Sequence, residues 1–211
     1  MVSSIKYSLW VMLLVSSPLF AQTTKSPVYG EVGLGIGQTL FGSQTKAKLQ
    51  QALGGGGFDP GTGNNISMAF YVAPETWRGL GIGSRIRGTF GAPVDGSGGD
   101  SYIFNYYNLA LSAKYYPSGQ FSKGLYGRGS VGFGQFTAKR LNEESTNKTY
   151  VHQYALGTSL MAGAGYTFPF RRTSLSIEAE WESSSRTGTV DQVGEVNFRS
   201  GQLGLNVILG F

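Results

Sequence analysis

Cysteine is absent from this 211-residue sequence, and histidine occurs once, at His152. The absence of cysteine excludes a disulfide-stabilised scaffold, a thiolate zinc site and a cysteine nucleophile. One imidazole cannot form a histidine-rich metal site, so we expect no metal or other cofactor. Charge is also scarce: 14 % of residues are charged, and the formal net charge of +5 is mild. The charges are scattered, so we expect no binding of nucleic acid.

Long apolar runs are missing as well. A membrane-spanning helix needs about 20 consecutive apolar residues, and no segment after residue 21 reaches that length. Glycine, by contrast, occupies 33 positions and interrupts nearly every apolar stretch, at a cost of about 1 kcal/mol per position inside a helix. Because 40 % of residues are hydrophobic and 13 % aromatic, disorder is disfavoured. The composition therefore predicts a strand-rich domain.

Residues 1–21 read as a cleaved secretory signal peptide. Lys6 gives the segment a positive start, an apolar stretch runs from Leu9 to Phe20, and Ala21 offers a small residue for cleavage. We therefore predict that residues 22–211 form the mature domain. A retained anchor helix is the alternative, but the apolar run is shorter than a spanning helix requires.

Apolar residues recur with period two, which is the signature of strands with two unlike faces. In the clearest case Ile177 and Trp181 share one face, while Glu178, Glu180 and Glu182 share the other. Eight such segments follow one another after residue 27. The fold class that we predict is therefore all-β, a closed eight-stranded antiparallel up-and-down transmembrane β-barrel.

The connections support this arrangement because they alternate in length. Short turns are marked by Pro74, Pro117 and Pro169. The long connections are expected at about residues 41–64, 91–101, 140–150 and 186–193. In the first of these, residues 46–53 read as a short helical turn, and residues 54–57 as a glycine tether that could serve ligand binding or act as a spacer.

One segment breaks the pattern near the end of the chain. Val196 and Phe198 have the opposite parity to the apolar residues that follow from Leu203. A β-bulge near Ser200 and Gly201 would reconcile the two parities. Alternatively, the part of this strand that contains Val196 and Phe198 lies outside the apolar environment.

Periodicity alone does not decide whether the apolar face points to lipid or into a soluble, lipocalin-like core. Glycines crowd the polar face, which suits the narrow interior of an eight-stranded barrel. Ions enclosed in a lumen must pair to offset the cost of desolvation, and this face carries four positive and four negative residues. The predicted lumen network is Glu31, Arg85, Arg87, Lys114, Arg128, Glu178, Glu180 and Glu182.

Aromatic residues gather near the predicted strand ends on the short-turn side, as in an interfacial girdle. The predicted girdle residues are Trp77, Tyr115, Tyr166, Phe168 and Phe211. No charged residue interrupts the apolar face between the strand ends. Both features favour a face that contacts lipid.

The signal segment, the eight alternating strands and a last strand that ends in Phe211 together resemble the small eight-stranded outer-membrane β-barrel proteins of diderm, Gram-negative bacteria (OmpA/OmpX-like barrels). The resemblance implies a monomer in the cell outer membrane, with a side-chain-filled barrel and long loops at the cell surface. It also implies contact with membrane lipids, including lipopolysaccharide. The terminal aromatic residue resembles the family's signal for the outer-membrane insertion machinery. The resemblance implies no reaction and identifies no extracellular ligand.

Two features suggest specific chemistry. Arg85 and Arg87 lie four strands from Glu178 and Glu180, so the two pairs should meet across the lumen as a permanent plug or as a gate. The three glutamates could also provide paired carboxylates for general acid–base catalysis. A substrate could not enter a filled lumen, however.

Some barrels of this shape are lipid A-modifying enzymes. The segment after His152 lacks the serine that a lipid A deacylase uses, and Asp100-Ser101 resembles a palmitoyltransferase dyad without the histidine of the first loop. We therefore predict a non-enzymatic protein with a structural or surface-binding role. A small-solute channel is the first alternative, and a lipid A-modifying enzyme is the second.

Overall fold

The computed structural model describes residues 27–52, 61–95, 101–141, 152–190 and 194–211. The predicted signal peptide, residues 1–21, lies outside these ranges, as do the glycine tether and Asp100. The described elements, in chain order, are β1 (Val28–Phe41), α2 (Ser43–Ala52), β2 (Thr62–Val72), η1 (Glu75–Trp77), β3 (Leu80–Gly91), β4 (Val94–Asp95), β5 (Ser101–Tyr115), β6 (Gly124–Leu141), β7 (His152–Pro169), β8 (Ser174–Val190) and β9 (Gly194–Gly210).

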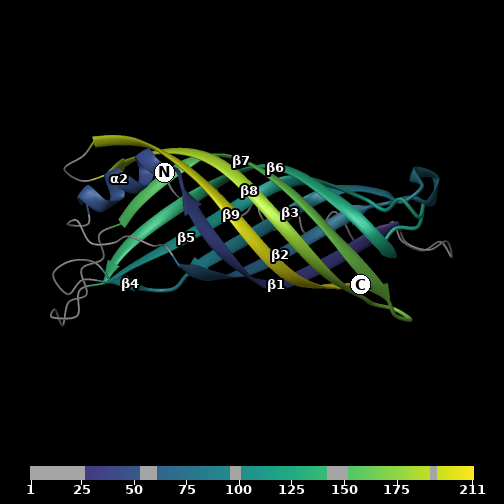
Figure 1. Cartoon of the computed structure of the whole chain (residues 1–211). Coiled ribbons are helices and arrows are strands. Elements are labelled where there is room, and N and C mark those ends of the chain that lie inside the picture. The colour runs from purple at the N-terminus through teal and green to yellow at the C-terminus, as the bar shows by residue number, and fades with distance from the viewer. Residues whose placement is uncertain (1–26, 53–60, 96–100, 142–151, 191–193) are drawn as a thin grey trace, which may run out of the picture.

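Eight long antiparallel strands close into a barrel (Figure 1). Each pairs with its neighbours along the chain, and β1 pairs with both β2 and β9, so that the sheet has no free edge. The two-residue strand β4 extends the hairpin before β5. The prediction of a closed eight-stranded up-and-down barrel is confirmed. Neither described helix, α2 or the 3-10 turn η1, is long and apolar enough to cross a membrane.

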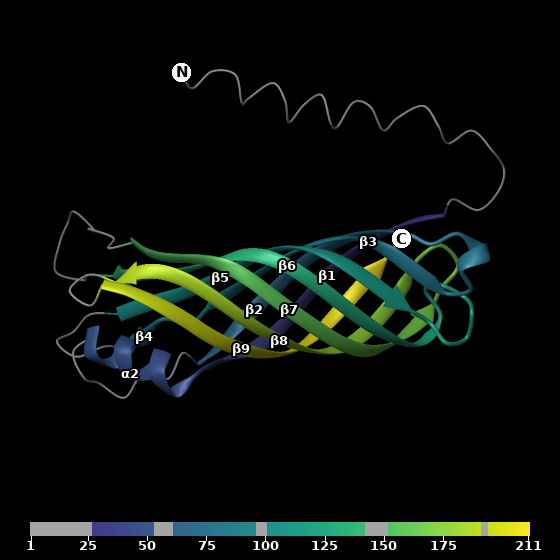
Figure 2. The ribbon, with the colours of Figure 1, turned by 90° about the horizontal axis from the view of Figure 1, so that it is seen from above.

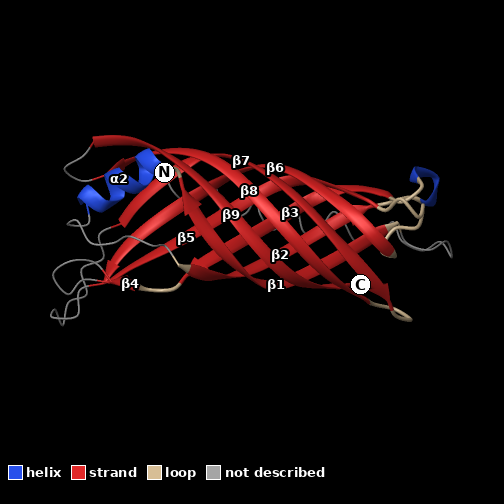
Figure 3. Ribbon diagram, in the orientation of Figure 1, coloured by secondary structure: helices blue, strands red, loops and turns tan. Residues whose placement is uncertain are grey.

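The two ends of the barrel differ. The end with α2 and β4 is here called the loop end, and the end with η1 and the short connections is called the turn end (Figures 2 and 3). α2 agrees with the helical turn predicted in the first connection. Its residue Thr45 ties it to β9, because the Thr45 hydroxyl accepts a hydrogen bond from the Arg199 backbone N–H at 3.1 Å.

The wall of the barrel has an apolar outside and a polar inside. Outward side chains such as Leu111 and Leu34 are 69 % and 61 % exposed, whereas the alternate positions carry buried polar and charged groups. This is the reverse of a soluble globular protein, in which apolar residues fill the interior. The apolar face predicted from the period-two pattern is therefore the exterior.

The strands at the loop end are longer than the sequence indicated. β8 continues to Val190 and β9 starts at Gly194, so the predicted long connection at 186–193 is wrong. The register between β8 and β9 is unbroken from Ser174 to Val190, so there is no β-bulge near Ser200. Val196 and Phe198 instead point inward, where both are buried.

Candidate functional site

All eight residues of the predicted lumen network point into the barrel, and none is more than 7 % exposed. They come from β1, β3, β5, β6 and β8. The period-two geometry of each strand explains the arrangement, because the residues on a given strand share one parity and therefore one face. The lumen is the candidate site of this protein.

Near the turn end, Glu31 holds two cations. Lys114 Nζ lies 2.5 Å from Glu31 Oε1, and Arg128 Nη2 lies 3.0 Å from Glu31 Oε2. Arg128 Nη2 is also 3.0 Å from Glu178 Oε2 on β8, so it bridges two carboxylates on different strands. Tyr126 donates a further hydrogen bond to Glu178 at 2.9 Å.

Toward the loop end the pairing crosses the lumen between β3 and β8. Arg85 contacts Glu180, and its Nη2 lies 3.9 Å from Glu178 Oε1. Arg87 Nη1 lies 2.8 Å from both Glu180 Oε1 and Glu182 Oε2. These are the two strands that the sequence places on opposite sides of an eight-stranded barrel.

One further member of this network, Arg186, is not among the residues predicted from the sequence. Its Nη2 lies 3.0 Å from Glu182 Oε1 and donates to Asn108 Oδ1 at 3.0 Å, and its side chain is 1 % exposed. The predicted balance of four cations and four carboxylates is therefore wrong, since Arg186 adds a fifth cation. The sequence does indicate that Arg186 faces the lumen, because it has the same parity as Glu178, Glu180 and Glu182.

With Arg186 included, the ion pairs form one unbroken series in which cations and carboxylates alternate. We call it the ion-pair column. Its order from the turn end is Lys114, Glu31, Arg128, Glu178, Arg85, Glu180, Arg87, Glu182 and Arg186. Each carboxylate lies between two cations, so every buried negative charge of the column is compensated on both sides.

Aromatic side chains cover the loop end of the column. Phe136 packs against Phe104 with ring centroids 5.9 Å apart, against Tyr106 at 5.0 Å and against Phe198 at 5.2 Å. Arg186, the last cation of the column, lies 5.5 Å from the centre of the Tyr106 ring. We call this group the loop-end cap, and it comprises Tyr102, Phe104, Tyr106, Phe136, Ala155, Val196 and Phe198.

A second aromatic group, the turn-end cap, covers the other end of the column. Its rings are Tyr29, Tyr71, Tyr116, Phe121 and Tyr126. Lys114, the first cation of the column, lies 3.8 Å from the centre of the Tyr126 ring. At the edge of the cap, burial raises the pKa of the Tyr116 hydroxyl, which hydrogen bonds with Thr167 at 3.0 Å.

The predicted girdle residues all lie on the outside near the turn end. Their exposed fractions are 41 % for Trp77, 51 % for Tyr115, 48 % for Tyr166, 46 % for Phe168 and 59 % for Phe211. The rings of Tyr166 and Phe168 contact each other with centroids 4.8 Å apart. Trp77 belongs to η1 rather than to a strand.

Comparison with solved structures identifies the architecture. Ail, the attachment invasion locus protein of Yersinia pestis, solved in complex with the heparin analogue sucrose octasulfate, matches with a TM-score of 0.55 and 15 % identity, over 87 % of this chain and 99 % of that chain. Neisserial surface protein A matches with a TM-score of 0.50 and 12 % identity, over 87 % and 96 %. No protein-family model and no curated protein sequence matches the chain.

This chain has the fold of the small outer-membrane β-barrels. At these identities the likeness shows the fold alone, because one fold hosts many functions. The function of such a barrel depends on its own residues.

Only some of the residues that could serve as catalytic groups lie within the described ranges. His152 is the first residue of β7, paired with Lys139 of β6, whereas Asp100 lies outside the described residues. Glu178, Glu180 and Glu182 each contact at least one guanidinium group. Within the described ranges no group of three acidic, histidine or cysteine residues is arranged to hold a metal ion.

Proposed function

We propose that this protein is a non-enzymatic, integral β-barrel of the bacterial outer membrane, with a plugged polar lumen and a structural or surface-binding role carried by its loop end. The proposal includes export by the N-terminal signal and an orientation with the loop end outside the cell. It rests on three features of the described residues. These are the apolar exterior, the ion-pair column with its two caps, and the loop end, into which strands continue and where α2 is fixed.

The exterior supports a position in the membrane. Outward residues from the girdle up to Trp181 on β8 and Leu203 on β9 include no charged side chain among the described positions. A lysine or arginine facing lipid at mid-depth would cost about 2–4 kcal/mol. In water, so large an apolar surface would promote association. A bilayer is the environment in which this surface is stable.

The ion-pair column is the single observation that carries the plugged lumen. Nine charged side chains alternate in sign through the interior, and an aromatic cap covers each end. A solute that crossed the barrel would have to separate buried ion pairs, and removing one partner of such a pair costs about 3–5 kcal/mol. The same pairing supports a non-enzymatic protein, because the carboxylates are occupied and shielded from substrate.

The loop end supports a role at the surface. The strands β5 to β9 continue into this end, and α2 is fixed there against β9 through Thr45. Loops on a rigid scaffold are where binding residues usually lie. Ail, whose name refers to attachment and which was solved with a heparin analogue, supports by analogy the use of this fold for binding.

The plug is tested by single-channel recording in planar bilayers. Wild-type protein is expected to give negligible current, whereas Arg85→Ala with Arg87→Ala is expected to conduct ions and to unfold at a lower temperature. Unchanged current together with unchanged heat stability in the double variant would contradict the plug. Steady current through the wild-type protein, altered by lumen substitutions, would instead establish the small-solute channel.

Location and surface binding need their own measurements. Density-gradient separation of inner and outer membranes should place the protein in the outer-membrane fraction. Exchange of the loop-end connections should abolish capture of any specific ligand and leave the barrel folded. Binding that survives the exchange would contradict a role for the loops.

A further inference from the structure

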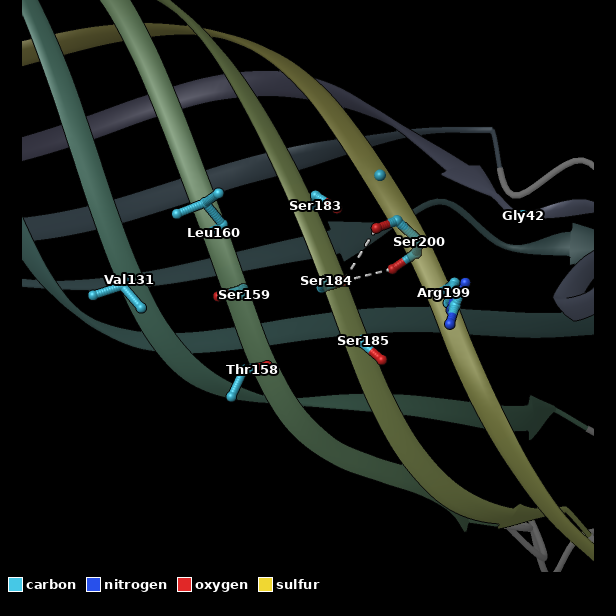
Figure 4. Close-up of a pocket in the computed structure, with 11 residues that line it drawn as sticks. Gly42, Val131, Thr158, Ser159, Leu160, Ser183, Ser184, Ser185, Arg199 and Ser200 are labelled. Atoms are coloured by element: carbon cyan, nitrogen blue, oxygen red, sulfur yellow. Dashed lines mark hydrogen bonds between the residues drawn. The ribbon is translucent and has the colours of Figure 1, made fainter.

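A groove crosses the outer surface of β6 to β9 near the loop end. It is about 610 Å³ in volume. Figure 4 shows Val131 and Leu160 at one side and Arg199 at the other, with Thr158, Ser183 and Ser185 between them. Ser184 and Ser200, whose hydroxyls hydrogen bond at 2.8 Å, belong to the barrel wall beneath the groove.

The groove lies across the edge of the apolar exterior that is nearer the loop end. On β8 the outward series passes from Trp181 to Ser183 and Ser185, and on β9 it passes from Leu203 to Gly201 and then Arg199. Apolar and polar surface meet here within two residues on neighbouring strands. In a membrane protein this is the level at which acyl chains give way to headgroups.

Arg199 is held on a fixed backbone. Its N–H donates to the Thr45 hydroxyl at 3.1 Å, and its carbonyl accepts from the Gly42 N–H at 3.0 Å. The side chain itself is exposed on the outside of β9. These two hydrogen bonds to the Gly42–Thr45 segment fix the backbone position from which the Arg199 side chain extends.

The surrounding charge is positive. Lys46 and Lys48 are exposed on α2, which packs on β9. Among the described residues of β7, β8 and β9 the one outward-facing acid is Glu195, four residues beyond Arg199 toward the loop end. The groove therefore joins a cationic side, a row of hydroxyl groups and an apolar side.

We propose that this groove binds the phosphorylated headgroup of one lipid of the outer leaflet. The Arg199 guanidinium donates to phosphate oxygens, for which its planar geometry is well suited, and the hydroxyls of Ser183 and Ser185 donate additional hydrogen bonds. The acyl chains lie along Val131 and Leu160. A free phosphate or a soluble polyanion fits less well because it leaves the apolar side of the groove empty. This inference rests on the proposed membrane location.

The test uses native mass spectrometry of the full chain in detergent, titrated with diphosphoryl lipid A. Wild-type protein is expected to retain one lipid, and Arg199→Gln to weaken its binding about tenfold or more, because a hydrogen bond to a charged group contributes about 1.5–3 kcal/mol. Arg199→Lys, which keeps the charge without the planar geometry, should fall between the two. The matched control is Arg172→Gln, an exposed cation in the turn between β7 and β8 at the other end of the barrel.

Further measurements identify the ligand and distinguish a failure of this inference from a failure of the proposed function. Inorganic phosphate should not displace the bound lipid, and the dephosphorylated lipid should bind the wild-type protein more weakly. Equal losses in Arg199→Gln and Arg172→Gln, or displacement by phosphate alone, would overturn the lipid site. Folding is checked for each variant by its heat-dependent gel shift. A protein that inserts into vesicles but binds lipid A no better than the dephosphorylated lipid disproves the groove alone, whereas failure to insert disproves the membrane location.

Discussion

Arg87 on β3 and Glu182 on β8 lie on opposite walls of the barrel, yet Arg87 Nη1 and Glu182 Oε2 are 2.8 Å apart. The lumen is narrow enough for two long side chains to meet near the axis. Glu182 also accepts from Asn108 at 3.0 Å and contacts Arg186. Charged groups from two strands and an amide from a third are thus held together at this position of the ion-pair column. The contacts of each charge differ along the column, so the contribution of each position can be tested separately.

The first prediction concerns position within the column. Arg128 lies between Glu31 and Glu178, whereas Arg186 ends the column and contacts Glu182 alone among the carboxylates. Arg128→Met should lower the free energy of unfolding by about 3–5 kcal/mol, because two buried carboxylates, Glu31 and Glu178, each lose one of their two cations. Arg186→Met should cost less, since Glu182 keeps Arg87 and Asn108. Urea unfolding in detergent micelles, followed by tryptophan fluorescence, measures both.

The control for this comparison is Lys123→Met, at an exposed position in the turn between β5 and β6. It should change the free energy of unfolding by less than about 0.5 kcal/mol. Equal losses for Arg128→Met and Arg186→Met would show that the column does not act as a series of pairs.

Much of this arrangement could be predicted from parity. Glu178, Glu180 and Glu182 alternate with apolar residues, so the sequence places them on one face and opposite the arginines of β3. Arg186 was missed because the residues around it do not alternate in polarity. Both faces of β8 are polar here, because Ser183, Ser185 and Thr187 face outward while Ser184 and Arg186 face inward. Period two is visible only when the two faces differ in polarity.

The inverted parity of Val196 and Phe198 has the same physical origin. Beyond Leu203 the outside of β9 carries Arg199 and Asn197, while the inside carries the loop-end cap. The barrel here has the polarity of a water-soluble protein, with an apolar interior. The strand does not change register; its surroundings change, and strand polarity follows the surroundings.

The second prediction tests which part of the outside faces lipid. Leu111 is 69 % exposed on β5 within the apolar exterior, and Leu111→Arg should destabilise the membrane-inserted protein by about 2–4 kcal/mol. Thr187→Arg, outward on β8 beyond the groove, should have little effect because the side chain contacts water. Folding equilibria in lipid vesicles distinguish the two. Similar tolerance of both substitutions would contradict a lipid-facing exterior.

The third prediction concerns the loop-end cap. Phe136 is 1 % exposed and contacts Phe104, Tyr106 and Phe198. Phe136→Ala should lower the free energy of unfolding by about 3–5 kcal/mol, as expected for truncation of a buried aromatic ring. Hydrogen exchange should rise at the loop end of β5, β6 and β9 while the strands around the ion-pair column stay protected. Uniform loss of protection along all strands would show that the cap is not a separate packing unit.

The last prediction concerns the turn-end cap, where Gly81 makes room for Phe121. A Cβ atom at Gly81 would overlap the ring of Phe121, which also packs against Tyr29 and Tyr116 with centroids 4.7 Å and 5.1 Å away. Gly81→Ala should therefore destabilise the protein by about 1–3 kcal/mol through overpacking. In a Phe121→Ala background the same substitution should cost less than about 0.5 kcal/mol, because the obstructing ring is gone.

Thermal unfolding of the two single variants and the double variant gives this coupling directly. Gly127→Ala is the matched control, since a Cβ there meets no atom within 4 Å, and it should be nearly neutral in both backgrounds. An equal cost of Gly81→Ala with and without the Phe121 ring would mean that Phe121 does not occupy the barrel mouth. Strong coupling would instead establish that the turn between β5 and β6 closes this end of the ion-pair column with an aromatic side chain.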